Sequence, residues 1–176
     1  MKPSTLRLTT LVLSLAASGF ASAETYIVDR YQDDTAKGSL RWAIEQSNAN
    51  ATQENEIQIQ AVGTAPYVIK LNQALPPIKS SVKIIGTQWD KTGEFIAIDG
   101  SNYIKGEGAK ACPGANPEQY GTNVRTTTLP GLVLQDVNGV TLKGLDIHRF
   151  CIGVLVNRSS NNLIQHNRIS NNYGGS

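Results

Sequence analysis

The 176-residue sequence is short of charged and of aromatic side chains. Charged residues make up 17% of the chain and aromatic residues 6%, whereas a globular chain usually carries about 25% charged residues. Small polar residues, glycine and asparagine take their place. This composition favours a turn-rich β protein over a helical bundle, a coiled coil or a charged disordered tail.

The sequence also has no apolar run long enough to anchor it in a membrane, since a span needs about 20 residues. The most apolar stretch, Leu8–Phe20, is short and contains Thr, Ser and Gly. Lys2 and Arg7 give it a basic beginning, and Ala21–Ala23 (Ala-Ser-Ala) provides a cleavage site. We therefore predict that residues 1–23 are a signal peptide and that the protein is secreted, periplasmic or held at the cell surface.

An excess of charge of one sign is missing too. The chain has 16 Lys and Arg against 14 Asp and Glu, and the predicted signal peptide contains two of the basic side chains. The remaining charges balance, so bulk charge gives no support for binding to nucleic acid.

Only two cysteines occur, Cys112 and Cys151. An even number in an exported chain indicates a disulfide, and the alternative is a pair of small buried thiols. Two cysteines without a nearby histidine cluster do not make a zinc site. The sequence has no P-loop, no G-x-G-x-x-G and no G-x-S-x-G, so we predict neither a cofactor nor a metal site.

One helix and many short strands are predicted. Ser39 is a good helix N-cap, and Leu40, Ala43 and Ile44 follow with the spacing of one helical face. The asparagine-rich residues 48–55 end this helix. The pattern then changes to an alternation of apolar and polar residues in short runs closed by turn residues, which indicates strands. These runs are 56–60, 67–71, 81–85 and 95–98.

An internal repeat follows a less regular region. Residues 101–130 show little periodicity and are predicted to form a long loop. Residues 141–147 and 163–169 match at an offset of 22 residues, with Leu142 opposite Ile164. A short-strand repeat of this period is typical of solenoids, and the leucine-rich pattern is absent, so a parallel β-helix fits better.

Several segments carry a resemblance to a known family. Gly38–Ile44, followed by Asn48–Asn50, resembles the "GSLR-x-AI…AN" opening of secreted bacterial right-handed β-helix proteins of the pectate-lyase-like superfamily. Residues 140–145 and 161–169 resemble their later coils. The resemblance implies an all-β fold, a right-handed parallel β-helix with coils of about 22 residues. It also implies that the helix caps the open end of the stack through Leu40, Ala43 and Ile44.

The expected organisation has three parts. Residues 1–23 form the signal peptide, residues 24–55 the first strand and the capping helix, and residues 56–176 the β-helix coils with the loop at 101–130. We expect the stack of coils to be incomplete at its C-terminal end. Further coils downstream, or self-association, would then cover that end.

The resemblance leaves two functions open. The first is an exported module that binds, and processes as a lyase or epimerase, an acidic polysaccharide; the second is a non-catalytic adhesin or structural stalk. Whether the chain is an enzyme stays undecided. An extracellular polysaccharide is the expected partner, and neither nucleic acid nor a membrane is expected.

One cluster of side chains is the best candidate for chemistry, because elimination needs a base and cations that neutralise a carboxylate. Asp146 and Arg168 match at the 22-residue offset, so they would lie on adjacent strands about 4.8 Å apart. The alternative is an ordinary surface ion pair. The catalytic candidates are Asp146, His148, His166 and Arg168. Arg149 and Tyr103 are the candidates for ligand contact.

Overall fold

The computed structural model describes residues 23–104, 112 and 129–173. The predicted signal peptide and most of the predicted loop at 101–130 therefore lie outside the described residues. The strands are β1 (Thr25–Val28), β2 (Asn55–Ile59), β3 (Val68–Lys70), β4 (Val82–Gly86), β5 (Ile96–Asp99), β6 (Pro130–Gln135), β7 (Thr141–Lys143), β8 (Leu145–His148), β9 (Ile152–Asn157), β10 (Leu163–Gln165) and β11 (Arg168–Ser170). The helices are α1 (Leu40–Ala49) and α2 (Trp89–Thr92).

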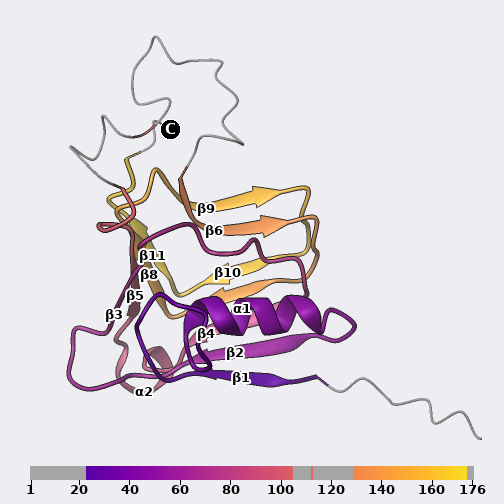
Figure 1. The fold of residues 1–176 in the computed structure, drawn as a ribbon, viewed down its shortest axis with the longest axis horizontal. Coiled ribbons are helices and arrows are strands. Elements are labelled where there is room, and N and C mark those ends of the chain that lie inside the picture. Colours follow the sequence, from indigo (N-terminus) through magenta and orange to yellow (C-terminus); the bar gives the residue numbers. More distant parts are fainter. Residues whose placement is uncertain (1–22, 105–111, 113–128, 174–176) are drawn as a thin grey trace, which may run out of the picture.

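The strands pair in parallel in three sheets (Figure 1). The first sheet has the order β1-β2-β4-β7-β10, the second β3-β5-β8-β11, and the third β6-β9. From β2 onward consecutive strands lie in different sheets, so β7, β8 and β9 each belong to another sheet. Each sheet therefore brings together strands that are distant in the sequence.

The predicted class, an all-β right-handed β-helix solenoid, is wrong. The structure has parallel sheets with helices interleaved between their strands, which is an α/β type of fold. The 22-residue spacing joins Thr141 to Leu163, but Thr25 pairs with Glu56 and Lys83 with Thr141, at longer and unequal spacings. The prediction extended one local spacing to the whole chain, whereas helices and loops of differing length separate most paired strands.

Alternation along the strands builds the core. In β5 the side chains of Ile96 and Ile98 are fully buried, and in β8 Leu145 and Ile147 are as well. Each such aliphatic side chain contributes roughly 1.5–3 kcal/mol by leaving water. The residues between them point to the opposite face of the sheet, and this outer face is where the polar groups of β5 and β8 gather.

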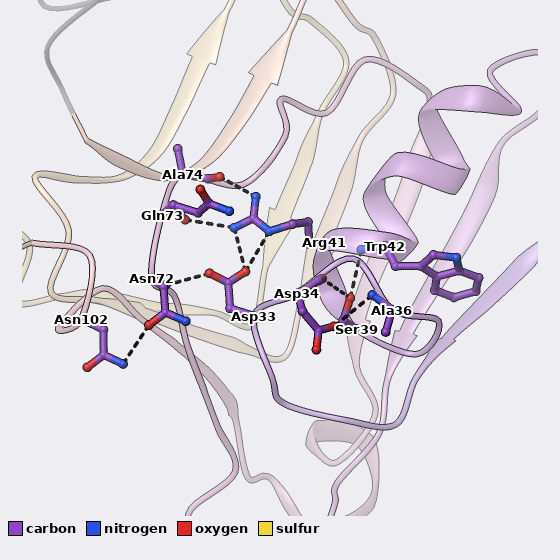
Figure 2. A network of polar contacts seen from close by, with 10 residues as sticks. All are labelled: Asp33, Asp34, Ala36, Ser39, Arg41, Trp42, Asn72, Gln73, Ala74 and Asn102. Carbon is purple, nitrogen blue, oxygen red and sulfur yellow. Dashed lines mark hydrogen bonds and ion pairs between the residues drawn. The ribbon is translucent and has the colours of Figure 1, made fainter.

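Helix α1 covers the first two strands, since it contacts β1 and β2. The Ser39 side chain accepts a hydrogen bond from the Trp42 amide at 3.1 Å and so caps the helix. Arg41 extends from α1 to Asp33, and Figure 2 shows the polar network around this pair. Among the described residues, neither helix has the length and apolar character that a membrane crossing requires.

Asparagine side chains fix the turns that lead into β8 and leave it. The Leu145 amide donates to Asn167 Oδ1 at 3.0 Å, and Asn167 Nδ2 donates to the Leu142 carbonyl at 2.8 Å. After β8, the Phe150 amide donates to Asn172 Oδ1 at 3.0 Å. These amide groups bond to backbone atoms of the turns, and they hold β8 at both ends.

Candidate active site

A groove lies on the outer face of the second sheet. The strand register places Val68, Ala97, Asp146 and Arg168 side by side in one row across β3, β5, β8 and β11. All four line a cavity of about 410 Å³. The small side chain of Ala97 in the middle of this row leaves the space that a larger residue would fill.

Two loops form the walls of this groove. Residues Ala65–Tyr67 stand on one side, and Gly93–Phe95 stand on another. The volume falls in the range of about 300–1,000 Å³ that is usual for small-molecule sites. The groove therefore has the size and the mixed lining of a site for a small organic ligand.

His148 is the central titratable group of the groove. Its Nδ1 lies 3.1 Å from Asp146 Oδ1, and its Nε2 lies 3.9 Å from Asp99 Oδ1. An ionised carboxylate only accepts hydrogen bonds, so Asp146 selects the tautomer in which Nδ1 carries the proton. Nε2 is then the basic nitrogen. The side chain is 18% exposed, so water and small ligands reach it.

Asp99 is a buried carboxylate that lies beside His148 and binds Arg149. Its side chain is 2% exposed, and it accepts hydrogen bonds from the Ser101 amide at 2.8 Å and from Arg149 Nη1 at 3.0 Å. Arg149 directly follows β8 with a left-handed backbone, φ 62°, which such a side chain adopts only with support from its surroundings. The Asp99–Arg149 pair therefore fixes the end of β8 that carries His148.

Arg168 brings a positive charge to the groove. Its Nη1 lies 3.3 Å from Asp146 Oδ2, and its guanidinium carbon lies 4.9 Å from the centre of the Phe95 ring. Phe95 is itself stacked on Trp89, with ring centres 4.7 Å apart. The Arg168 side chain remains 59% exposed, so it keeps donors for a ligand.

The structure brings together three of the four catalytic candidates. Asp146, His148 and Arg168 line the groove, whereas His166 stacks on Trp89 with ring centres 5.5 Å apart and is not among the lining residues. His166 therefore lies against Trp89 and outside the groove lining.

The two candidates for ligand contact do not line the groove either. Arg149 is bound to Asp99. Tyr103 lies against Phe150, with ring centres 6.4 Å apart, and burial raises the pKa of its phenol. Tyr103 is thus a packing residue in the described part of the chain.

The two cysteines and the three predicted capping residues of the helix are buried and serve the packing of the fold. Cys112 and Cys151 form a disulfide, and both sulfur-bearing residues are buried beside Ile104. In α1, Leu40, Ala43 and Ile44 are buried in the main core. None of these five residues lines the groove.

Sequence reasoning missed three residues of the site: Phe95, Ala97 and Asp99. Asp99 is the last residue of β5. The signal that could have found them is the alternation itself. Ile96 and Ile98 are buried, so the residues around them belong to the outer face.

The described part of the chain contains no group of three or more His, Cys, Asp or Glu side chains that could hold a metal ion. The chemistry that these side chains can perform is proton transfer by His148 and binding of an anion by Arg168.

Comparison with known proteins identifies a close relative. No known protein-family profile matches the chain. The chain is 84% identical over 175 residues to a 3-dehydroshikimate dehydratase of Acinetobacter baylyi. The matched residues are 99% of this chain but 36% of the relative, so the chain spans little more than a third of the relative's length.

This comparison corrects the functional predictions. The predicted membership in the pectate-lyase-like superfamily is wrong, because the relative is a protein named as a dehydratase. The predictions of a module that binds or processes an acidic polysaccharide and of an adhesin or structural stalk are wrong for the same reason. The misleading evidence was the short opening motif, which indicates an arrangement of elements and says little about chemistry.

Proposed function

We propose that this chain is part of a dehydratase that removes water from 3-dehydroshikimate. The observation that carries the proposal is the 84% identity to a 3-dehydroshikimate dehydratase over 99% of the chain. The groove over Ala97 supports it, because the groove contains a histidine paired with a carboxylate and an exposed guanidinium. The substrate calls for both groups, since it is a ring carboxylate that carries a ketone and hydroxyl groups.

Removal of water from a hydroxy ketone needs one group that moves protons. A base takes a proton from a carbon activated by the carbonyl, the electrons of that C–H bond lead to a new C=C bond, and the hydroxyl group leaves. The hydroxyl needs a proton to depart as water. A single side chain can take the first proton and deliver it to the leaving group, so that water is the sole product released besides the unsaturated ring.

His148 is the residue that suits this role. Asp146 holds its Nδ1 at 3.1 Å, which keeps the ring in place and leaves Nε2 as the base. Asp99 and Arg149 brace the strand end beneath it. In this assignment Asp146 positions His148 and does not itself take the proton.

The test is the conversion of 3-dehydroshikimate by the whole natural protein, at the length that its gene encodes. The new ring double bond changes the ultraviolet absorbance, so initial rates follow from a spectrophotometer. We expect His148→Gln to lower kcat by about 10²–10⁴, the usual share of a general acid–base. The control is Arg158→Gln, in an exposed ion pair with Asp136 outside the groove lining, and it should match the wild type.

The two possible failures have different meanings. A wild-type protein that does not convert 3-dehydroshikimate would refute the proposed function. A His148→Gln variant as fast as the wild type would leave the function standing and would remove His148 from the mechanism.

We also propose that the chain is exported and that residues 1–23 are removed. The basic start, the apolar stretch and the Ala-Ser-Ala site support this. The Cys112–Cys151 disulfide also suits an oxidising compartment. N-terminal sequencing of the protein from its producing cell should begin at Glu24, and a start at Met1 would refute removal of the signal peptide.

A further inference from the structure

We infer that Arg168 binds the carboxylate of the ring substrate and that Phe95 is the positioning residue that holds Arg168 ready. The inference rests on the proposed function for the identity of the ligand. Its geometric basis is the groove itself, where Arg168 is the one lysine or arginine among the described residues of the lining.

The charges along the groove restrict where an anion can bind. Two carboxylates, Glu94 and Asp146, belong to the same lining. Asp146 lies against Arg168 and offsets part of its charge, whereas Glu94 repels a negatively charged ligand at its own position. The ligand's carboxylate is therefore accepted at Arg168 and directed away from Glu94. The groove therefore favours one orientation of a ring that carries its charge at one end.

Two contacts hold the Arg168 guanidinium in place but occupy few of its hydrogen-bond donors. One nitrogen lies 3.3 Å from Asp146 Oδ2, a long contact for a charge-assisted hydrogen bond. The guanidinium rests over the Phe95 ring, which limits its motion, and within the described part of the chain its remaining N–H groups have no hydrogen-bond acceptor. A planar guanidinium with free donors suits a carboxylate, which it binds with two parallel hydrogen bonds.

Two other arginines, Arg149 and Arg158, are committed to carboxylates outside the groove lining. Arg149 donates to the buried Asp99 at 3.0 Å. Arg158 binds Asp136 through both Nε and Nη2, and it does not line the groove. Arg168 is thus the guanidinium with spare donors at the groove.

The distance from Arg168 to His148 suits one small ring. Arg168 pairs with Asp146 across the strands, and His148 lies two residues further along β8 on the same face. Two residues of a strand span about 7 Å, which one substituted six-membered ring can bridge. A ring bound through its carboxylate at Arg168 then lies over Ala97 and presents its far carbons to His148.

The test compares the binding of shikimate and of methyl shikimate to the whole natural protein. Shikimate keeps the carboxylate but lacks the ketone, so it binds without reacting, and the methyl ester removes the charge. Fluorescence reports binding, because Trp89 is stacked on Phe95; calorimetry provides a second readout. The variants are Arg168→Gln and, as the matched control, Arg158→Gln, since the two arginine side chains are 59% and 62% exposed.

We expect Arg168→Gln to weaken shikimate binding at least about tenfold, as loss of a charge-assisted hydrogen bond does. Arg158→Gln should bind as the wild type does. The ester should bind the wild type and Arg168→Gln equally weakly. Equal shikimate affinities of the wild type and Arg168→Gln, or no detectable binding to the wild type, would overturn the inference.

The positioning role of Phe95 is tested separately, by steady-state kinetics. Phe95→Leu should raise KM for 3-dehydroshikimate several-fold and leave kcat nearly unchanged, while Phe95→Tyr should restore KM because it keeps the ring under Arg168. A loss of kcat in Phe95→Leu without a change in KM would contradict the positioning role. If shikimate binding depends on Arg168 but the protein has no dehydratase activity, the proposed function is refuted and the anion-binding role of Arg168 is supported.

Discussion

The buried ion pair between Arg41 and Asp33 gives the sharpest prediction about stability. Asp33 Oδ1 accepts from Arg41 Nε at 2.9 Å and from Arg41 Nη2 at 2.7 Å, and Asp33 Oδ2 accepts from the Asn72 amide at 2.7 Å. The side chains of Arg41 and Asp33 are 6% and 1% exposed. As Figure 2 shows, the pair ties the start of α1 to the chain that precedes it and to the segment at Asn72–Ala74.

Asp33→Ala leaves the guanidinium of Arg41 buried without its counter-charge. Its hydrogen bonds to the carbonyls of Ala74, at 2.6 Å, and of Gln73, at 3.1 Å, remain. Such a loss of one partner costs about 3–5 kcal/mol, against a total stability of about 5–15 kcal/mol for a typical domain. In a domain of this size the midpoint of thermal unfolding should fall by roughly 6–20 °C.

Urea unfolding followed by circular dichroism measures this change, with Asp136→Ala as the control. Asp136 has a comparable arginine partner but is half exposed, so its loss should cost far less than the loss of Asp33. The double variant Asp33→Ala with Arg41→Met removes both charges and should recover part of the loss. A cost below 1 kcal/mol for Asp33→Ala, or a double variant less stable than the single one, would refute the reasoning.

Three further predictions concern other parts of the fold. Gly131→Ala should destabilise the protein by about 1–3 kcal/mol in a urea titration, because the new Cβ would lie 2.8 Å from a buried aromatic ring and 2.7 Å from a backbone carbonyl; an unchanged midpoint would contradict the close packing. Reduction of the Cys112–Cys151 disulfide, which joins residues 39 apart, should cost about 4 kcal/mol by the loop-closure relation, and an equal midpoint with and without reductant would disprove this. The Arg158 guanidinium lowers the pKa of the Asp136 carboxyl below its ordinary 3.8. The ion pair therefore stabilises the fold above pH 3.8, and this contribution disappears as the pH falls through the lowered pKa. An NMR titration should show the pKa of Asp136 returning toward 3.8 in Arg158→Gln, and an unchanged pKa would refute the pairing.

The helix and the strands in which apolar residues recur at a regular spacing could be predicted from the sequence. The helical spacing after Ser39 coincides with α1, which begins at Leu40. The alternating runs at 81–85 and 95–98 coincide with β4 and β5 to within a residue or so. In α1 and β4 buried side chains alternate with more exposed ones, and that contrast is the signal that a sequence carries. All four residues of β5 are buried, and its signal is the alternation of large aliphatic with smaller or polar side chains.

Strands β6 and β9 were not predicted, and their burial explains why. In β9, Val154 and Leu155 are neighbours of intermediate exposure and Val156 is 47% exposed, so no apolar–polar alternation marks the strand. β6 begins with Pro130 and Gly131, which usually indicate a turn. Among the described residues, the two strands pair only with each other, and Ile78 adds an isolated bridge to Leu134 of β6.

The fold class and the function went wrong for a different reason. The match at 22 residues and the opening motif are local, and a local pattern does not determine how far an arrangement extends along the chain. The cluster of Asp146, His148 and Arg168 was accessible because the strand register brings Asp146 and Arg168 together. The groove beside it depends on Ala97 and on the loops at 65–67 and 93–95, whose approach is a tertiary property.

A crystal structure of the whole natural protein with shikimate bound tests the central claim most directly. We expect the carboxylate within hydrogen-bond distance of Arg168 and the ring over Ala97, with its far side facing His148. A shikimate molecule bound at full occupancy elsewhere, with this groove occupied by water alone, would contradict the assignment of the site.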